Sequence, residues 1–272
     1  MTEYTGRRFT VDNWGYPPQS RESFQQVQSL FPTARLRRGP GPITTFNSDS
    51  KDNFSFSYEG ADGSQRTVQK MLADSYTDAF IVMKENVIVC EHYENGMAVD
   101  SFHLLNSVTK SFVGMLAGIL ISKNLISETD LVIQHIPELA GTAFSESTIR
   151  HLLDMTAAPK YGEDYADPSA DFWVEAAVVG WRPELRTKES APTLLAYAET
   201  LVDSEQRNGE KYHYRSVLTN MLGMVLERAG QGSLQEQLQN EIWRKLGPEQ
   251  DASIVVDRVG FPYVGAGMSA CA

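Results

Sequence analysis

The sequence predicts an α+β fold in which a helical lobe packs against an antiparallel sheet. Residues 79–83 and 87–93 are rich in β-branched and aromatic side chains, and the short segment 84–86 between them indicates a β-hairpin. Residues 106–250 instead hold several apolar or amphipathic segments of helical length. We expect helices at 68–76, in the apolar run that follows Ser107, and at 148–156, 192–202, 217–229 and 233–246, with a helix or turn start at 127–130 and a short amphipathic segment at 21–31.

The length of 272 residues fits either one large domain or two lobes that share a cleft. No internal repeat or low-complexity tract divides the chain. We predict a single module with an N-terminal arm at 1–65, the hairpin and a flanking helix at 66–105, the mainly helical lobe at 106–250, and the start of a C-terminal region at 251–272.

The composition narrows the classes of partner and location. A net charge of −11 argues against nucleic acid or an anionic membrane as the main partner. The two cysteines, Cys90 and Cys271, form neither a disulfide framework nor a metal-binding spacing, which favours a reducing compartment. The N-terminus has no apolar signal region, and the apolar run 112–121 is too short to cross a bilayer. We therefore expect a cytoplasmic protein without a membrane partner. The composition does not decide whether the protein forms a homodimer.

The central motif is Ser107-Val108-Thr109-Lys110, at the start of the apolar run 112–121. Residues three apart on a helix lie on the same face, so Ser107 and Lys110 are expected to project together. A serine hydroxyl needs a nearby base to become a nucleophile, and a partly neutral lysine can supply one. The alternative is that Ser107 caps the helix and Lys110 is a solvated residue of its first turn.

A second copy of the same spacing, Ser48 and Lys51, shows how weak the bare pattern is. It lies in a polar run without helical periodicity, which predicts an exposed loop. Only the copy at Ser107 precedes a segment that is apolar on every face and therefore belongs in the protein interior.

A tyrosine can complete a serine-lysine pair by passing the proton to the leaving group. The candidate is Tyr214, which follows Lys211 closely and precedes the apolar helix expected at 217–229. Ser216 is placed to cap that helix. His213, flanked by two tyrosines, is expected to form a packing or hydrogen-bonding contact, and the five scattered histidines show no zinc-ligand spacing. No metal and no cofactor are predicted.

Together, the segments 107–110, 149–156 and 214–216, with Gly223 after the last, resemble the serine β-lactamase and penicillin-binding-protein superfamily. Within its esterase and class C-like branch, the chain is most similar to the 6-aminohexanoate-dimer hydrolase group. The segments 13–18 and 163–165 also point to that group.

The resemblance implies a β-lactamase/transpeptidase-like fold and a role for each matched residue. Ser107 would be the acylated nucleophile, Lys110 its base, and Tyr214 the proton relay. Tyr165 and Ser216 would contact the substrate or assist the lysine. Trp181 and Trp173 either line the cleft or pack in the core.

The implied activity is that of a serine hydrolase that forms an acyl-enzyme on a carboxylic ester or small amide. The acidic side chain that favours amide-dimer hydrolysis in that group is not recognised in the matching segment, which reads Val174-Glu175-Ala176-Ala177, and this favours esters. The alternative is a non-catalytic or truncated penicillin-recognising-type binding protein. The third family motif is missing, and 265–272 resembles a glycine-rich turn and helix start that leads into further strands in relatives. We therefore expect an incomplete sheet, formed chiefly by 79–83 and 87–93, and weak activity.

Overall fold

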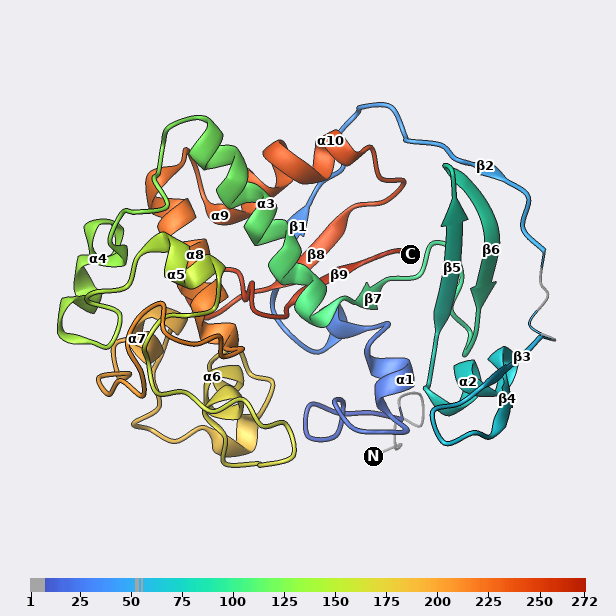
Figure 1. The fold of residues 1–272 in the computed structure, drawn as a ribbon, viewed down its shortest axis with the longest axis horizontal. Coiled ribbons are helices and arrows are strands. Elements are labelled where there is room, and N and C mark those ends of the chain that lie inside the picture. The colour runs from blue at the N-terminus through green and yellow to red at the C-terminus, as the bar shows by residue number, and fades with distance from the viewer. Residues whose placement is uncertain (1–7, 52–53, 55) are drawn as a thin grey trace, which may run out of the picture.

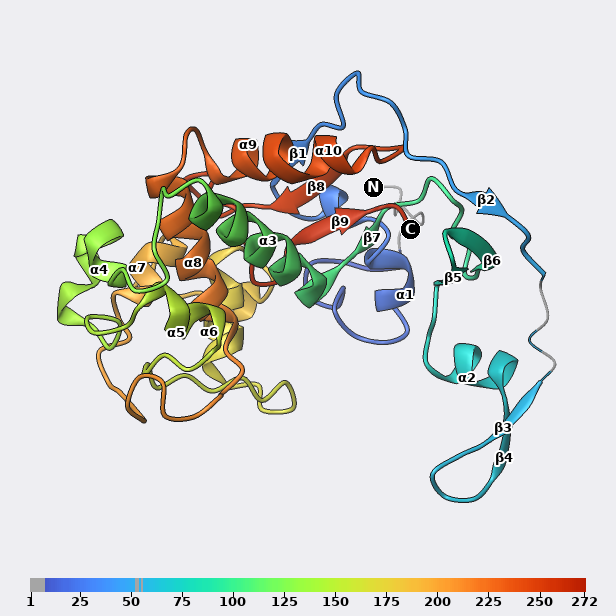
Figure 2. The same ribbon diagram turned by 45° about the horizontal axis from the view of Figure 1, so that its top comes forward.

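The computed structural model describes residues 8–51, 54 and 56–272. A helical body occupies one side of the molecule, and the hairpin with its flanking helix occupies the other (Figure 1). A four-stranded antiparallel sheet with the strand order β1-β8-β9-β7 lies between them. The view in Figure 2 shows the same arrangement, with the C-terminal end of the chain between this sheet and the hairpin.

The four-stranded sheet positions the beginning of the central helix. Its last two strands are joined through His103 opposite Ala270 and Leu104 opposite Ser269. Because β7 runs directly into residues 106–108, this pairing holds the following turn against the sheet. The strands are β1 (Thr33–Leu36), β7 (His103–Leu104), β8 (Ala252–Val255) and β9 (Met268–Ala270).

This sheet corrects two expectations from the sequence. The sheet does not consist chiefly of the hairpin, and the segment 265–272 contains strand β9 instead of a helix start. The strands involved are only two to four residues long, and every residue of β8 and β9 is buried. Such short, fully buried strands show no alternation of polar and apolar residues that a sequence pattern could reveal.

The predicted hairpin is confirmed. Strand β5 (Ala79–Lys84) pairs antiparallel with β6 (Val87–Tyr93). The two connecting residues, Glu85 and Asn86, both have positive φ (48° and 62°), as a tight two-residue hairpin turn requires. Strand β2 (Asn47–Ser48) joins β6 in parallel, so the segment predicted as a loop is in part a short, exposed strand.

A second, smaller hairpin precedes the flanking helix on this side of the molecule. Strands β3 (Ser57–Glu59) and β4 (Gln65–Thr67) pair antiparallel around the turn between them. Helix α2 (Val68–Asp74) follows at once, and its amide at Lys70 bonds the side chain of Thr67 as an N-cap.

Two long helices form the centre of the helical body. Helix α3 (Thr109–Ser122) packs against α8 (Ser216–Ala229), in which all residues from 216 to 226 are buried. The remaining helices and turns are α1 (Ser20–Ser23), α4 (Val132–His135), α5 (Ile149–Leu153), α6 (Asp171–Val178), α7 (Leu194–Ala198), α9 (Leu234–Leu238) and α10 (Arg244–Leu246), with 3₁₀ turns at Val27–Ser29, Asn106–Val108, Pro137–Gly141 and Pro183–Leu185 and a π-helical turn at Gln239–Trp243.

Most predicted helices are present, with shorter or interrupted bounds. The segment 21–31 divides into α1 and a separate 3₁₀ turn, and the helix expected at 192–202 contains only the five residues of α7. The helix expected at 233–246 holds a π-helical turn and ends, as predicted, at Gly247, whose φ is 65°. Within the described part of the chain, no helix combines the length and apolar character that a membrane span needs.

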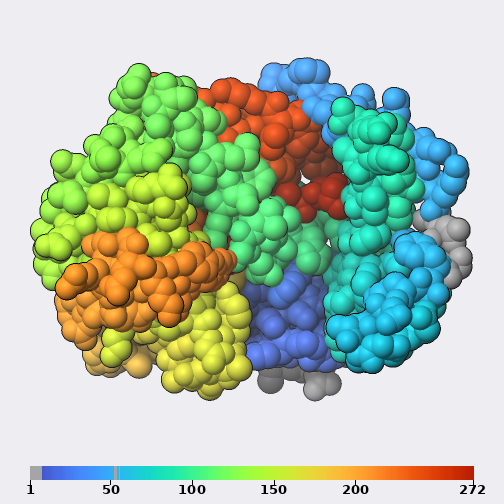
Figure 3. Space-filling view, viewed as in Figure 1, coloured from blue at the N-terminus to red at the C-terminus, as the bar shows by residue number. Residues whose placement is uncertain are grey.

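The hairpin stands apart from the four-stranded sheet. Figure 3 shows a hollow between the hairpin and the rest of the molecule. A cavity of about 470 Å³ lies there, lined on one side by β5 and β6 and on the other by the end of α10 and the last two residues of the chain. Its lining includes Phe46, Ile81, Met83, Ile88, Val99, Trp243 and Leu246.

Candidate active site

Ser107, the nucleophile predicted from the sequence, lies in the 3₁₀ turn between β7 and α3. Asn106, immediately before it, has a φ of 44°, a left-handed conformation that costs free energy in a non-glycine residue. Thr109 fixes the turn because its hydroxyl donates to the carbonyl of Asn106 (2.7 Å) and accepts from the amide of Met268 (3.1 Å). Ser107 is therefore held, half-buried, where the sheet meets the helix.

Lys110 lies in the first turn of α3, and its Nζ contacts three oxygen atoms. They are Ser107 Oγ at 2.9 Å, Ser216 Oγ at 2.9 Å and the carbonyl oxygen of Gly265 at 2.5 Å. A neutral amine carries two N–H bonds and one lone pair. The carbonyl of Gly265 can only accept a hydrogen bond, and Ser216 Oγ donates to another residue, so both receive an N–H. As an ammonium, Nζ donates to all three oxygens; in the neutral form that a base requires, its lone pair would face Ser107 Oγ.

Tyr214 approaches the same hydroxyl from a different element. Its Oη donates to Ser107 Oγ at 2.7 Å, and Nζ of Lys110 lies 4.9 Å from the centre of its ring. The neighbouring Arg215 is fully buried at the start of α8, where it donates to the carbonyl of Ala157 (2.9 Å) and pairs with Glu205. Arg215 therefore anchors the backbone that carries Tyr214.

Glu163 connects Ser216 to the loop that carries Tyr165. One carboxylate oxygen accepts from the Ser216 amide at 2.5 Å, and the other accepts from Ser216 Oγ at 2.7 Å. Tyr165 Oη donates to Glu163 Oε1 at 2.7 Å, and burial together with this carboxylate raises the pKa of Tyr165 above its usual value. Because Ser216 gives its only proton to Glu163, its oxygen remains free to accept from Lys110.

The serine-lysine-tyrosine arrangement and the fold around it have known relatives. Residues 65–267 match the Beta-lactamase family. The chain belongs to the β-lactamase family. Three residues from distant parts of the sequence, Ser107, Lys110 and Tyr214, thus meet within a β-lactamase-family fold.

Individual relatives agree with this assignment. The chain is 31% identical over 268 residues to the 6-aminohexanoate-dimer hydrolase of Paenarthrobacter ureafaciens. This match covers 97% of the chain and 64% of that relative. The chain thus spans less than two thirds of the length of this relative. A structure from Bacillus anthracis, assigned as a 6-aminohexanoate-dimer hydrolase, has a TM-score of 0.87 at 24% identity and covers 97% of this chain and 69% of its own. A class C β-lactamase mutant has a TM-score of 0.54 at 13% identity, covering 75% and 59%. Both structures have the same β-lactamase/transpeptidase-like α+β fold as this chain.

One side of Ser107 in this β-lactamase-family chain opens into an aromatic cavity of about 340 Å³. Trp181 and Tyr165, both predicted as substrate-binding residues, line it together with Trp173. Trp181 is also 5% exposed and packs edge-on against Trp14, so the core and cleft alternatives both hold for it. The complete lining is Trp14, Gly15, Phe24, Asn106, Ser107, Tyr165, Phe172, Trp173, Trp181 and Ala266, none of which carries a charge.

A second cavity, of about 350 Å³, opens on another side of the same serine. It contains the side chains of Lys110 and Tyr214 and is bounded by residues of α3, α5 and α8. The exposed Tyr212 lines it as well. Ser107 therefore lines two separate cavities.

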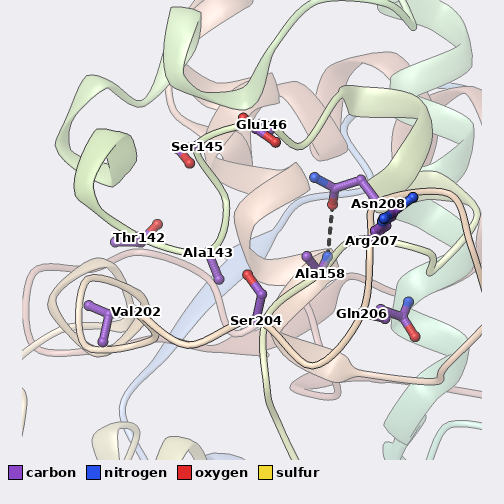
Figure 4. Close-up of a pocket in the computed structure, with 10 residues that line it drawn as sticks. All are labelled: Thr142, Ala143, Ser145, Glu146, Ala158, Val202, Ser204, Gln206, Arg207 and Asn208. Carbon is purple, nitrogen blue, oxygen red and sulfur yellow. Dashed lines mark hydrogen bonds between the residues drawn. The ribbon is translucent and has the colours of Figure 1, made fainter.

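A further cavity, of about 600 Å³, shares no residue with these two. Figure 4 shows that segments 142–146 and 202–208 face each other across it, with Asn208 bonded to the amide of Ala158 at 2.8 Å. Among the residues that the structure describes, no group of three or more His, Cys, Asp or Glu side chains could hold a metal ion.

Two expectations about residues outside the site are confirmed. Ser48 and Lys51 are both exposed, and Lys51 pairs with its neighbour Asp49 at 3.3 Å. His213 forms a hydrogen bond to Glu205 at 2.6 Å, as predicted for a residue without a catalytic role. The residue that sequence reasoning missed is Glu163, although the segment 163–165 was among those that carried the family resemblance.

Proposed function

We propose that this chain is the catalytic module of a serine hydrolase that cleaves a carboxylic ester or a small amide through an acyl-enzyme on Ser107. The observation that carries the proposal is the convergence on Ser107 Oγ of a lysine amine at 2.9 Å and a tyrosine hydroxyl at 2.7 Å. A nucleophile within hydrogen-bonding reach of a base, which other groups in turn orient, is the usual arrangement for covalent catalysis.

In the acylation step, Lys110 takes the proton of Ser107 while Oγ forms a bond to the carbonyl carbon of the substrate. The resulting tetrahedral intermediate then expels the alcohol or amine. Tyr214 passes a proton to the leaving group and is reprotonated by Lys110, so that both residues return to their starting state. In deacylation, water loses a proton to the same pair and releases the carboxylic acid, which regenerates Ser107.

The substrate class follows from the cavities beside the serine. The aromatic cavity has no charged residue in its lining, so we propose that it binds an uncharged, apolar acyl group. The cavity that contains Lys110 and Tyr214 would then hold the leaving group, next to the proposed proton relay. The name of the curated relative suggests an amide linkage, whereas the uncharged lining favours a simple ester.

The test is covalent labelling with a fluorophosphonate, followed by intact-mass measurement. The wild-type chain should gain the mass of one adduct, and Ser107→Ala should gain none. The matched control is Ser48→Ala, which removes the exposed serine of the second Ser-x-x-Lys copy and should leave labelling unchanged. An unlabelled wild-type chain, or a labelled Ser107→Ala, would refute the proposal.

The same preparation decides between an enzyme and a binding protein without turnover. An enzyme should release many equivalents of p-nitrophenol from a p-nitrophenyl ester. A single equivalent, coupled to a stable acyl adduct on Ser107, would support the binding alternative.

A further inference from the structure

Glu175 is a carboxyl group that lies completely inside the protein. It is located in α6, is 0% exposed, and lines neither cavity at Ser107. Its Oε2 accepts from the hydroxyl of Tyr161 at 2.5 Å, and its Oε1 accepts from Nδ2 of Asn220 at 2.7 Å. Burial of a carboxyl group among apolar helices costs free energy unless hydrogen bonds such as these compensate for the lost water. A group kept at this cost suggests a specific role.

Asn220 links this carboxyl group to the active site. It lies one turn after Ser216 on α8, and its Oδ1 accepts from the amide of Gly265 at 2.8 Å. The carbonyl of Gly265 in turn accepts from Nζ of Lys110 at 2.5 Å. Hydrogen bonds thus connect Glu175 with Asn220, Asn220 with the N–H of Gly265, and the carbonyl of Gly265 with the lysine that contacts Ser107; the backbone of Gly265 joins the last two.

The carboxylate decides which way the amide of Asn220 points. A side-chain amide has a donor end and an acceptor end of nearly the same shape, and the environment must choose between two orientations. An ionised carboxylate only accepts, so Glu175 selects the orientation in which Nδ2 faces it and Oδ1 faces the amide of Gly265. With the amide reversed, the donor end of Asn220 would meet the N–H of Gly265, and that contact would be lost.

Gly265 needs this support because glycine has the freest backbone of any residue. A Cβ there would lie 3.2 Å from Nδ2 of Asn220 and 3.3 Å from Cβ of Ser216, so helix α8 packs closely enough that even a methyl group would require a small shift. The hydrogen bond from its N–H to Asn220 restricts the backbone of Gly265 at one end, and the hydrogen bond from Lys110 to its carbonyl restricts it at the other.

We propose that Glu175 is a positioning residue for the catalytic lysine, acting through the side chain of Asn220 and the backbone of Gly265. This inference rests on the proposed function. It assigns the carboxylate no contact with substrate. Its effect is to hold the carbonyl that takes one N–H of Lys110, so that the lone pair of the amine stays directed at Ser107.

The charge of Glu175 itself changes with pH in the neutral range. Burial raises the pKa of Glu175 to about 7, whereas the hydrogen bonds from Tyr161 and Asn220 oppose this rise. Glu163 in a nearby loop raises the pKa of Glu175 and Lys110 in α3 lowers it, while Glu175 in turn raises the pKa of Tyr161 and Tyr263 in loops and of Tyr197 in α7.

The test exchanges donor and acceptor between the two buried side chains. In Asn220→Asp, two carboxyl groups face each other, and they avoid repulsion only when one of them holds a proton. Fluorophosphonate labelling of this variant should be slowed about tenfold or more at about pH 8, and less at about pH 6, relative to wild type at the same pH.

Adding Glu175→Gln to Asn220→Asp should restore the hydrogen-bonded series with the opposite polarity. The carbonyl of the introduced glutamine accepts from Tyr161, its amide donates to the introduced aspartate, and that aspartate accepts from the amide of Gly265. We expect the double variant to recover labelling to within about threefold of wild type, without the excess pH dependence of the single variant. Glu175→Gln alone should stay close to wild type, because its carbonyl can still accept from Asn220.

The outcomes separate the two proposals. Absence of labelling in the wild-type chain would refute the proposed function. A labelled wild type, with Asn220→Asp equally fast at every pH or with no rescue in the double variant, would refute only the positioning role of Glu175. If Asn220→Asp does not fold, as judged by its thermal melt, Asn220→Ala replaces it and should be slowed at every pH. Wild-type rates in Asn220→Ala would overturn the inference.

Discussion

Replacing Tyr214 by phenylalanine tests the proton relay directly. The change removes Oη, which lies 2.7 Å from Ser107 Oγ, and keeps the ring that faces Nζ of Lys110 at 4.9 Å. The folded structure should hardly respond, because the net contribution of one such hydrogen bond to stability is only about 1 kcal/mol. Catalysis should respond strongly, since a positioned proton donor contributes roughly a hundred- to ten-thousandfold to a rate.

The size of the effect should depend on the leaving group. An alkyl ester expels an alkoxide that needs a proton, whereas p-nitrophenolate leaves readily without one. We therefore expect Tyr214→Phe to slow the acylation by an alkyl ester about a hundredfold or more, and by a p-nitrophenyl ester about tenfold or less. The second value reflects only the lost hydrogen bond to Ser107.

The assay is steady-state hydrolysis of the two esters with the same acyl group. Tyr212→Phe is the matched control, because Tyr212 is 61% exposed, lies two residues away and lines the same cavity. It should leave both rates within about threefold of wild type. Equal losses for the two esters in Tyr214→Phe would exclude a proton relay to the leaving group, and unchanged rates would remove Tyr214 from the mechanism.

Two further predictions concern stability. Folding raises the pKa of Glu175 from 4.5 to about 7. Between these pH values the native chain holds a proton that the unfolded chain has released. The contribution of Glu175 to the free energy of unfolding should therefore fall by about 3 kcal/mol as the pH rises through this range. Urea unfolding of Glu175→Gln across this range should lack that fall, and an unchanged slope would contradict the assignment. Gly223→Ala should destabilise the protein by about 1–3 kcal/mol, because the new Cβ would lie 2.8 Å from the buried Val264 and 2.9 Å from the buried Leu234. Gly118 lies at an exposed helical position with no atom within 4 Å of a new Cβ, so Gly118→Ala should instead stabilise the protein by about 0.5–1 kcal/mol. Equal melting temperatures of the two variants would refute the packing argument.

Local patterns predicted the elements that are long enough to show a period. The hairpin 79–93, the apolar helix α3 and the buried helix α8 were all predicted from runs of five or more residues. Strands β7, β8 and β9 were missed, because two to four buried residues carry no periodic signal. The four-stranded sheet could be recognised only in the tertiary structure, because its strands come from distant segments, 33–36, 103–104, 252–255 and 268–270.

The candidate site divides in the same way. Ser107 and Lys110 were predicted from their spacing, since residues three apart on a helix share a face whatever the rest of the chain does. Tyr214 was proposed from its place before an apolar helix and from the family resemblance. Glu163 was not selected as a site residue, because a glutamate in a polar loop is most often solvated and nothing in the sequence distinguishes one that turns inward.

The sequence by itself predicted the proposed nucleophile and base, the hairpin and the central helices, because each depends on residues a few positions apart. The tertiary structure decided which distant groups complete the site. Glu163 reaches Ser216 across 53 residues, Asn220 reaches Gly265 across 45, and Lys110 reaches Gly265 across 155. Such contacts depend on how α3, α6 and α8 pack together, and a carboxylate acquires a particular role only when that packing removes it from water and leaves it specific partners.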